Sequence, residues 1–312
     1  MKRLSFSIVI FALVTAGLMT GCGKSHVDEG TVISVIYSTD THGKLEGCGC
    51  KKNGGGITRR AAKLEAARAE DGTVLYLDAG NFLSGSAPEN EGNNDAIIAA
   101  YNQMGATVVN VSERELARGI EAFRQAKKDS KFDYVSANVR FDGGSVADAY
   151  VMKKVKNANV AIVGLCGTKE TMRYDSSIFA AQVTVVDPLS AAKEVIPPLT
   201  GKADIIIVLS TCGDATDSLI ARDFQMVHLI IGGRSYRPNS DSPWVLGNAR
   251  VVRTERDGKS LGRMDMVFGA ERNIKTYSAS TLRMETSDPS SAEMLALVRR
   301  HIPNFVDHPT AP

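Results

Sequence analysis

The sequence has little excess charge of either sign, few aromatic residues and only one long apolar run. Its 312 residues include 37 Lys and Arg against 35 Asp and Glu, so the formal net charge is +2. A balance so close to neutral gives no electrostatic basis for binding a nucleic acid polymer. Aromatic residues make up 6% and hydrophobic residues 43%. This composition excludes a disordered chain, a collagen and a polytopic membrane protein.

The long apolar run lies near the N-terminus, between Ile8 and Leu18. It follows Lys2 and Arg3, and it is too short for a membrane-spanning helix. This order of charged, apolar and small residues is typical of a secretory signal peptide, which we predict for residues 1–21. The alternative is a buried N-terminal helix that ends in an ordinary Cys.

Small residues stand directly before Cys22 and resemble the bacterial lipobox. The resemblance implies that Cys22 is lipidated once residues 1–21 are removed, so that the membrane becomes a partner through this lipid anchor. The residue after the Cys is Gly23, and no Asp suggests retention in the inner membrane. We expect a lipoprotein of the cell envelope, in the outer membrane and facing the periplasm, with residues 22–30 as a polar tether.

Strand-like and helix-like patterns alternate along the rest of the chain. Apolar, β-branched runs predict strands, and apolar residues at helical spacing predict helices between them. The predicted strands span 32–37, 74–77, 107–111, 134–139, 160–165, 205–209 and 229–231, and the predicted helices span 58–69, 95–104 and 119–127. Strands at 244–254, 262–268 and 274–284 precede a last helix at 291–301. The near-continuous apolar strands indicate an α/β fold whose sheets are covered on both faces.

Polar residues and cysteines directly follow several of the predicted strands. In an open α/β sheet such residues meet at the carboxyl ends of the strands, where sites form. The residues in these positions are Asp40, His42, Asn81, Glu113, Arg114, Cys166, Thr211, Cys212, Arg234 and Tyr236. The alternative is that they only begin ordinary loops.

Three segments around these positions form an ordered set of motifs. They are Ser38-Thr39-Asp40-Thr41-His42-Gly43, Gly54 to Ala61, and Leu77 to Gly85. In this order they resemble the opening motifs of the calcineurin-like metallophosphatases, in the bacterial 5′-nucleotidase branch. Further segments continue in family order, and the resemblance covers about residues 31–285. The order of the segments is more specific than any single motif.

The resemblance implies an α/β fold of four layers, a metallophosphatase sandwich of two mixed β-sheets flanked by helices, over residues 31–285. Residues 286–312 would then form a C-terminal helix and tail. The family also implies two divalent metals bridged by one Asp, which polarise a phosphate ester and activate a water. Members of the bacterial branch carry a C-terminal domain that holds the nucleoside. This chain ends before such a domain, so the resemblance implies no nucleotide specificity.

The metal positions depart from the family pattern. Asp40 and His42 match the Asp and His of the first metal, whereas Asn81 stands at the position of the bridging Asp. A neutral amide bridges two cations poorly. The other changed positions hold Glu113 for an Asn ligand, Arg114 for the catalytic His, and Thr211, Arg234 and Tyr236 for ligand His residues. Because missing ligands sharply weaken a metal site, we do not expect an ordinary dinuclear centre.

In the first of three hypotheses, the site binds an anion without hydrolysing it. Arg114 and Arg234 would supply positive charge where the family has metals, and guanidinium groups suit phosphate or carboxylate. Thr211 and Asn81 would add hydrogen bonds. The competing interpretation is an internal ion pair between one of these arginines and Asp40 or Glu113.

The second hypothesis concerns the cysteines. Cys48, Cys50, Cys166 and Cys212 would all lie on the site edge of the sheets under this fold, and an exported chain meets an oxidising compartment. They would form two disulfides, or a thiolate metal or redox site together with His42, or they would remain free thiols.

The third hypothesis is a divergent metal-dependent phosphoesterase that acts on a phosphate ester or nucleotide. Asp40, His42, Asn81 and Glu113 would then hold one divalent metal, Mn, Zn or Fe. No replacement general acid is evident, since an arginine stays protonated. We favour the non-hydrolytic interpretation, a degenerate metallophosphatase domain that serves as an anion-binding, redox or structural module of the cell envelope.

Overall fold

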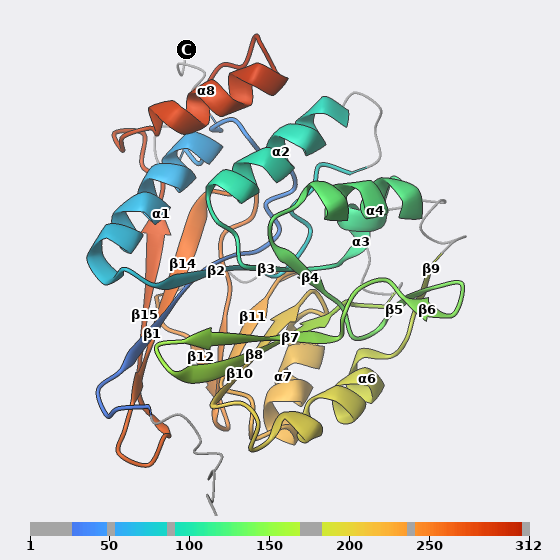
Figure 1. Ribbon diagram of the computed structural model, residues 1–312, viewed down its shortest axis with the longest axis vertical. Helices are drawn as coiled ribbons and strands as arrows, with labels where there is room; N and C mark the ends of the chain where they lie inside the picture. Colours follow the sequence, from blue (N-terminus) through green and yellow to red (C-terminus); the bar gives the residue numbers. More distant parts are fainter. Residues whose placement is uncertain (1–26, 49–53, 86–90, 169–182, 236–240, 308–312) are drawn as a thin grey trace, which may run out of the picture.

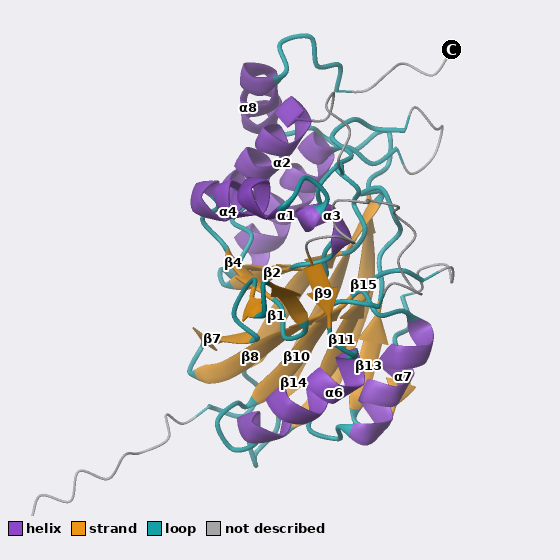
Figure 2. Cartoon of the chain, turned by 90° about the vertical axis from the view of Figure 1, so that its right-hand side faces the viewer, coloured by secondary structure: helices purple, strands orange, loops and turns teal. Residues whose placement is uncertain are grey.

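A computed structural model describes residues 27–48, 54–85, 91–168, 183–235 and 241–307 of the chain. Two six-stranded β-sheets pack face to face, and helices cover the outer face of each sheet (Figure 1 and Figure 2). This arrangement of four layers confirms the α/β sandwich expected from the sequence.

The first sheet is mixed. Its strands lie in the order β15 (Ile274–Arg283), β14 (Ser260–Phe268), β1 (Val32–Ser38), β2 (Val74–Asp78), β3 (Val108–Asn110) and β4 (Asp133–Val135). Strands β1 to β4 run parallel to one another, whereas β14 pairs antiparallel with both β1 and β15. The carboxyl ends of β1, β2 and β3 therefore share one edge of this sheet.

The second sheet is also mixed, with antiparallel strands at its two edges. Its order is β12 (Trp244–Leu246), β13 (Ala249–Val252), β11 (Leu229–Gly232), β10 (Ile205–Ser210), β8 (Ala158–Leu165) and β7 (Tyr150–Val155). A third, small sheet, which the sequence did not predict, joins β6 (Gly144–Ser145), β5 (Val139–Phe141) and β9 (Val183–Val185). The predicted strand at 134–139 is accordingly split between β4 and β5.

Helices cover the two sheets on opposite sides (Figure 2). Over the first sheet lie α1 (Ile57–Asp71), α2 (Glu91–Gln103), α3 (Glu113–Leu116), α4 (Ile120–Asp129) and α8 (Ala292–His301). Over the second lie α6 (Pro188–Val195), the short 3-10 helix η2 (Pro197–Leu199) and α7 (Asp214–Asp223).

Each sheet buries both of its faces, and the alternation of side chains in β10 shows how. Ile205, Ile207 and Leu209 enter the core between the two sheets, whereas Ile206 and Val208 pack under α6 and α7. Successive residues of a strand point to opposite faces, so a strand between two apolar layers must be apolar throughout. This is why the central strands could be recognised as continuous apolar runs.

Both ends of the described chain pack on this core. Val27 is 2% exposed and belongs to the core between the sheets, whereas residues 28–30, the last of the segment predicted as a tether, are exposed. At the other end, Met294 and Val298 of α8 are fully buried in the core under the helices of the first sheet. Within the described ranges, no helix is long and apolar enough to cross a bilayer.

Candidate functional site

A cavity of about 540 Å³ opens where loops from both sheets meet. The loop after β1 carries Asp40 and His42, the loop after β2 carries Asn81, and the loop after β11 carries Arg234. Glu113 and Arg114 begin α3, directly after β3. All six residues line this cavity, so the structure brings together side chains from positions 40 to 234 of the sequence.

The loops that carry these side chains are tightly bent. Asp40, His42, Asn81 and Arg234 have positive φ angles of 46°, 52°, 59° and 54°. Residues other than glycine occupy this left-handed region at an energetic cost, and they cluster at functional sites when they do. The backbone N–H of His42 donates to the carbonyl of Asn81 at 2.9 Å, which ties the loops after β1 and β2 to each other.

Glu115 holds the loop after β2 in place. Its buried carboxylate accepts hydrogen bonds from the backbone N–H groups of Asn81 at 3.1 Å, Phe82 at 2.8 Å and Ser112 at 2.9 Å. Ser112 and Glu115 also form the capping box that starts α3. Burial raises the pKa of Glu115, although these N–H donors act in the opposite direction. Glu115 therefore positions both Asn81 and Glu113.

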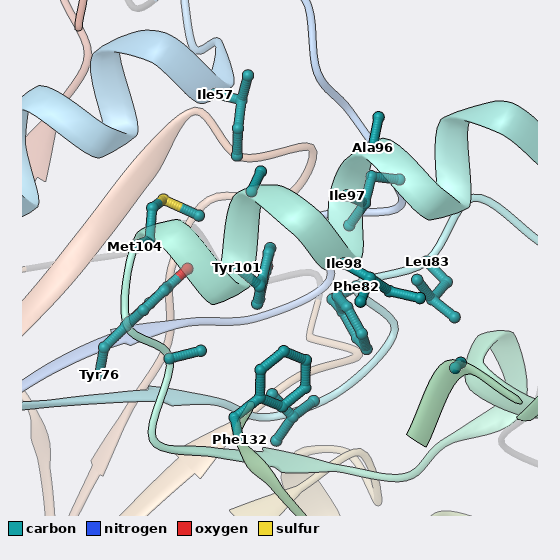
Figure 3. Packing of buried hydrophobic residues seen from close by; sticks show 14 of the residues in the cluster. Ile57, Tyr76, Phe82, Leu83, Ala96, Ile97, Ile98, Tyr101, Met104 and Phe132 are labelled. Carbon is teal, nitrogen blue, oxygen red and sulfur yellow. The ribbon is translucent and has the colours of Figure 1, made fainter. Parts of the chain in front are cut away.

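An aromatic cluster supports the same loop from behind. The ring of Phe82 lies 4.7 Å from that of Tyr101 and 6.0 Å from that of Phe132, measured between centroids. Figure 3 shows these three side chains packed below helix α2. Because Phe82 directly follows Asn81, its burial fixes the wall of the cavity to the core.

Protein donors already occupy both oxygens of the Asp40 carboxylate. Oδ1 accepts a hydrogen bond from Nδ2 of Asn81 at 2.9 Å, and Oδ2 accepts one from the backbone N–H of Arg234 at 2.6 Å. A Cβ added at Gly233 would lie 3.0 Å from Oδ2, so the chain after β11 passes directly over the carboxylate. The atoms expected to bind a metal are thus engaged by N–H groups.

Glu113 and Arg234 form a buried ion pair. Nη2 of Arg234 lies 2.5 Å from Oε2 of Glu113, and the two side chains are 9% and 8% exposed. Burial raises the pKa of Glu113, and the nearby guanidinium of Arg234 acts in the opposite direction. The internal pair that the sequence offered as the competing interpretation is therefore present, and Arg234 forms it.

The remaining donors of Arg234 have no hydrogen-bond acceptor. Nε and Nη1 are shielded from solvent and lack a partner within the described part of the chain. Buried N–H groups without an acceptor are costly, and each such case calls for an explanation. Arg114, the second guanidinium of the cavity wall, donates through Nη1 to the carbonyl of Ser84 at 3.0 Å.

His42 is held by an acid that the sequence did not reveal as part of the site. Nδ1 of His42 lies 2.9 Å from Oδ1 of Asp257, and its Nε2 lies 3.8 Å from Oδ1 of Asp40. The hydrogen bond with His42 lowers the pKa of Asp257. Asp257 stands in the turn before β14, and β14 pairs with β1. If the pairing of β14 with β1 had been inferred from the sequence, it would have placed this turn beside the loop after β1.

The described residues do not fit a bound metal. They include no group of three or more His, Cys, Asp and Glu side chains that could hold one. The reason lies in the contacts of the expected ligands: Asp40 accepts two N–H donors, Glu113 is paired with a permanent cation, and His42 is bonded to Asp257. The proposed set of Asp40, His42, Asn81 and Glu113 is therefore not arranged as a site for Mn, Zn or Fe.

Cys166, Cys212 and Thr211 do not line the cavity. Thr211 is fully buried, and its Oγ1 lies 3.0 Å from Oγ of Ser112. Cys166 and Cys212 are buried free thiols, which for these two residues agrees with the third of the alternatives left open, not with two disulfides. Burial raises the pKa of Cys166 to about 11, and it also raises the pKa of Cys212. Both shifts argue against a thiolate site at neutral pH.

Some predicted residues lie at the limits of what the structure describes. Cys48 is disulfide-bonded. Cys50, Tyr236 and Cys22, with the whole predicted signal peptide, lie outside the described residues. Lys44, Arg256 and Ser84 line the cavity but were not singled out from the sequence.

Known proteins resemble this chain in sequence. The 5′-nucleotidase of Bos taurus is 23% identical over 303 residues, which cover 86% of this chain and 52% of the relative. The 2′,3′-cyclic-nucleotide 2′-phosphodiesterase/3′-nucleotidase of Salmonella typhimurium is 24% identical over 284 residues, 83% of this chain and 43% of the relative. The chain thus spans about half the length of the curated relatives it matches. No protein-family model matches it.

Solved structures share its fold. The 5′-nucleotidase precursor from Thermus thermophilus superposes with a TM-score of 0.76 at 22% identity, over 88% of this chain and 59% of that one. The calcineurin-like phosphoesterase YfkN from Bacillus subtilis gives a TM-score of 0.74 at 19% identity, over 88% and 97% of the two chains. The chain therefore shares the fold of the calcineurin-like phosphoesterases and is similar in sequence to 5′-nucleotidases over about half of their length.

Proposed function

We propose that this protein binds a small anion in its cavity without hydrolysing it, as an exported lipoprotein of the cell envelope anchored through Cys22. The observation that carries the proposal is the Arg234 side chain. It is 9% exposed and stands in the cavity wall, with Nε and Nη1 lacking an acceptor among the described residues. An oxyanion in the cavity meets the side chain of Arg234 in the wall, and a shift of the guanidinium toward it supplies the missing acceptors.

The charges around the cavity favour an anion. Its buried carboxylates are engaged internally, Asp40 by N–H donors and Glu113 by Arg234. In contrast, Lys44 and Arg256 line the cavity without forming an ion pair within the described residues. Among the lining acids, Glu46 alone is exposed. The hydrogen bond with His42 and, to a lesser extent, the charges of Arg256 and Lys44 lower the pKa of Asp257, so a ligand with negative charge meets cations that are only partly balanced.

The same contacts argue against hydrolysis. Phosphate-ester hydrolysis in this fold family depends on metals that polarise the ester and activate a water, and the described side chains form no such group. Arg114 stands where the family has a catalytic His, and a guanidinium cannot give up a proton at working pH. At that position the cavity wall therefore keeps a charge for binding but offers no proton to a leaving group.

The proposed class of ligand follows from the volume of the cavity and from the relatives that the chain resembles. A cavity of about 540 Å³ falls within the range of sites that enclose small molecules. The relatives are named for nucleotides, and phosphate is an anion that guanidinium forks bind well. We propose a phosphate monoester, and a nucleoside monophosphate is the first probe.

Isothermal titration calorimetry of the metal-free full chain tests binding. Inorganic phosphate and AMP are titrated into wild type, Arg114→Ala and Lys63→Ala. Lys63 pairs with Asp288 outside the cavity and is the matched control. Loss of a charge-assisted contact predicts an affinity for AMP about tenfold or more weaker in Arg114→Ala and unchanged in Lys63→Ala. The proposal is contradicted if wild type binds none of phosphate, AMP and a carboxylate such as citrate.

Turnover distinguishes this proposal from the alternative, a divergent metal-dependent phosphoesterase. A phosphate-ester assay with added Mn²⁺ or Zn²⁺ should show no more product with wild type than with Asp40→Ala. If wild type binds metal stoichiometrically and its turnover is lost in Asp40→Ala, the protein is a phosphoesterase instead.

The anchor is tested separately in cells. Cys22→Ser should move the protein from the membrane fraction to the soluble fraction, because the thiol that carries the lipid is gone. Equal membrane association of both forms contradicts lipidation at Cys22.

A further inference from the structure

Arg234 stands among donors of the kind that divalent metals bind. Its backbone N–H donates to Asp40, and its guanidinium pairs with Glu113. Asn81 and His42 contact the same Asp40 carboxylate, at 2.9 and 3.8 Å. Carboxylate oxygens, an amide and an imidazole are an ordinary ligand set for Mn²⁺ or Zn²⁺, yet the positive charge among them belongs to an arginine.

We infer that the Arg234 side chain is a built-in cation that takes the place of a metal ion in this site. The wild-type chain therefore needs no divalent cation and excludes one. Truncation of Arg234 removes the guanidinium but keeps the backbone N–H that bonds to Asp40, so Glu113, which loses its counter-charge, should then bind an added divalent cation. This inference does not rest on anion binding, so either can fail without the other.

The physical reason is the charge of two buried carboxylates. Asp40 and Glu113 are 3% and 6% exposed, and Asp40 disfavours the charged form of Glu113. Buried carboxylates that are close together require a positive partner. Arg234 meets this requirement permanently, since a guanidinium does not lose its proton.

The same guanidinium excludes a metal by repulsion and by volume. A cation bound to Oε2 of Glu113 would lie within a few ångströms of Nη2 of Arg234, which is 2.5 Å from that oxygen. Like charges at such a distance in a poorly solvated site repel strongly. Truncation at Cβ would remove this charge and open space beside a cavity of about 540 Å³, through which an ion can enter.

Thermal unfolding of the full chain, in EDTA or in MnCl₂ or ZnCl₂, tests the inference. We expect Tm of Arg234→Ala to fall by roughly 5 °C or more in EDTA, because Glu113 loses its counter-charge. Added Mn²⁺ or Zn²⁺ should restore most of that loss, with about one ion bound per chain by mass spectrometry. Wild type should show neither bound metal nor a shift of Tm.

Two further variants tie the effect to the ion pair. In Arg234→Ala with Glu113→Gln the uncompensated charge is gone, so the dependence of Tm on the divalent cation should disappear. Arg256→Ala removes another cation that lines the cavity and should respond to metal as wild type does. Where the alanine variant does not fold, Arg234→Gln, which keeps bulk but not charge, gives the same comparison.

Three results overturn the inference. The first is a divalent metal purified stoichiometrically with wild type. The second is a neutral variant at position 234 whose Tm is insensitive to Mn²⁺ and Zn²⁺. The third is cation dependence that persists when Glu113 is also replaced by Gln.

Discussion

At the scale of single residues, Asp78 carries a buried carboxyl group beneath the loops of the cavity. It ends β2, is 1% exposed, and accepts hydrogen bonds from Oγ of Ser38 at 2.5 Å and from Oη of Tyr101 at 2.8 Å. Burial raises its pKa from 3.8 to about 7. No cation is bonded to Asp78 among the described residues, so it differs from Glu113, whose charge Arg234 balances.

Asp78→Asn should change how stability depends on pH. Because the pKa of Asp78 is higher in the folded state, that state binds more protons between about pH 4 and pH 7, and stability falls as pH rises through this window. The shift corresponds to about 4 kcal/mol for this group. Urea unfolding at pH 4, 6 and 8 should therefore show the variant gaining stability relative to wild type as pH rises. A difference that stays constant with pH contradicts this account.

The residues of the site were predictable to different degrees. Asp40, Asn81 and Arg234 follow apolar strands, and strand ends converge in an open α/β sheet, so their meeting could be expected. Asp257 could not be placed in this way, because its contact with His42 joins positions 215 residues apart through the antiparallel pairing of β14 with β1. The choice of Glu113 as the partner of Arg234 depends on side-chain geometry that a sequence does not contain.

At the scale of elements, the two sheets approach closely at Gly164 of β8. A Cβ at this position would lie 2.5 Å from Oδ1 of Asn110 and 2.5 Å from the carbonyl oxygen of Val135. Those residues belong to β3 and β4 of the opposite sheet. Nδ2 of Asn110 bonds to the carbonyls of Ala79 and Leu165 at 3.0 and 2.9 Å, so the approach also fixes the loop that leads to Asn81.

Gly164→Ala should destabilise the protein strongly. The added methyl group meets backbone atoms that cannot rotate away, and overpacking of this kind costs about 1–3 kcal/mol or more. Gly144→Ala is the control, because a Cβ there meets its nearest neighbour at an ordinary 3.6 Å. Urea unfolding should show a lower midpoint for Gly164→Ala with Gly144→Ala close to wild type. Equal midpoints for all three proteins contradict the close approach.

Buried elements were easier to predict than half-exposed ones. The runs at 160–165 and 205–209 are apolar throughout because they lie between two layers, and both correspond to strands of the second sheet. Strand β7 was missed, since this edge strand alternates exposed and half-buried residues and contains lysines. Helix α6 was missed although Asp187 caps it and Pro188 begins it, a start signal that its short length obscured.

At the scale of the whole molecule, α8 closes the core under the helices of the first sheet. Met294 and Val298 are fully buried there together with residues of α1 and α2. Ser291 caps the helix by accepting a hydrogen bond from the backbone N–H of Met294 at 3.3 Å. The C-terminal segment, expected as a separate helix and tail, therefore shares the core that supports the loop after β2.

Met294→Ala should lower the stability of the whole domain. Removing a fully buried side chain leaves a cavity and costs about 2–5 kcal/mol, and a shared core predicts one cooperative unfolding transition. Arg300→Ala, at an exposed position of the same helix, should have little effect. An early, separate transition of the C-terminal helix, seen by hydrogen exchange, contradicts a single core.

The central claim is that an arginine has replaced the metals and leaves an anion site. Its most direct test is the structure of a crystal grown with Mn²⁺ and phosphate. The account predicts phosphate in the cavity beside Arg234 and Arg114, and no anomalous Mn peak within bonding distance of Asp40 or Glu113. Two Mn peaks about 3.5–4 Å apart, as in dinuclear hydrolases, with Arg234 displaced from Glu113, would contradict it.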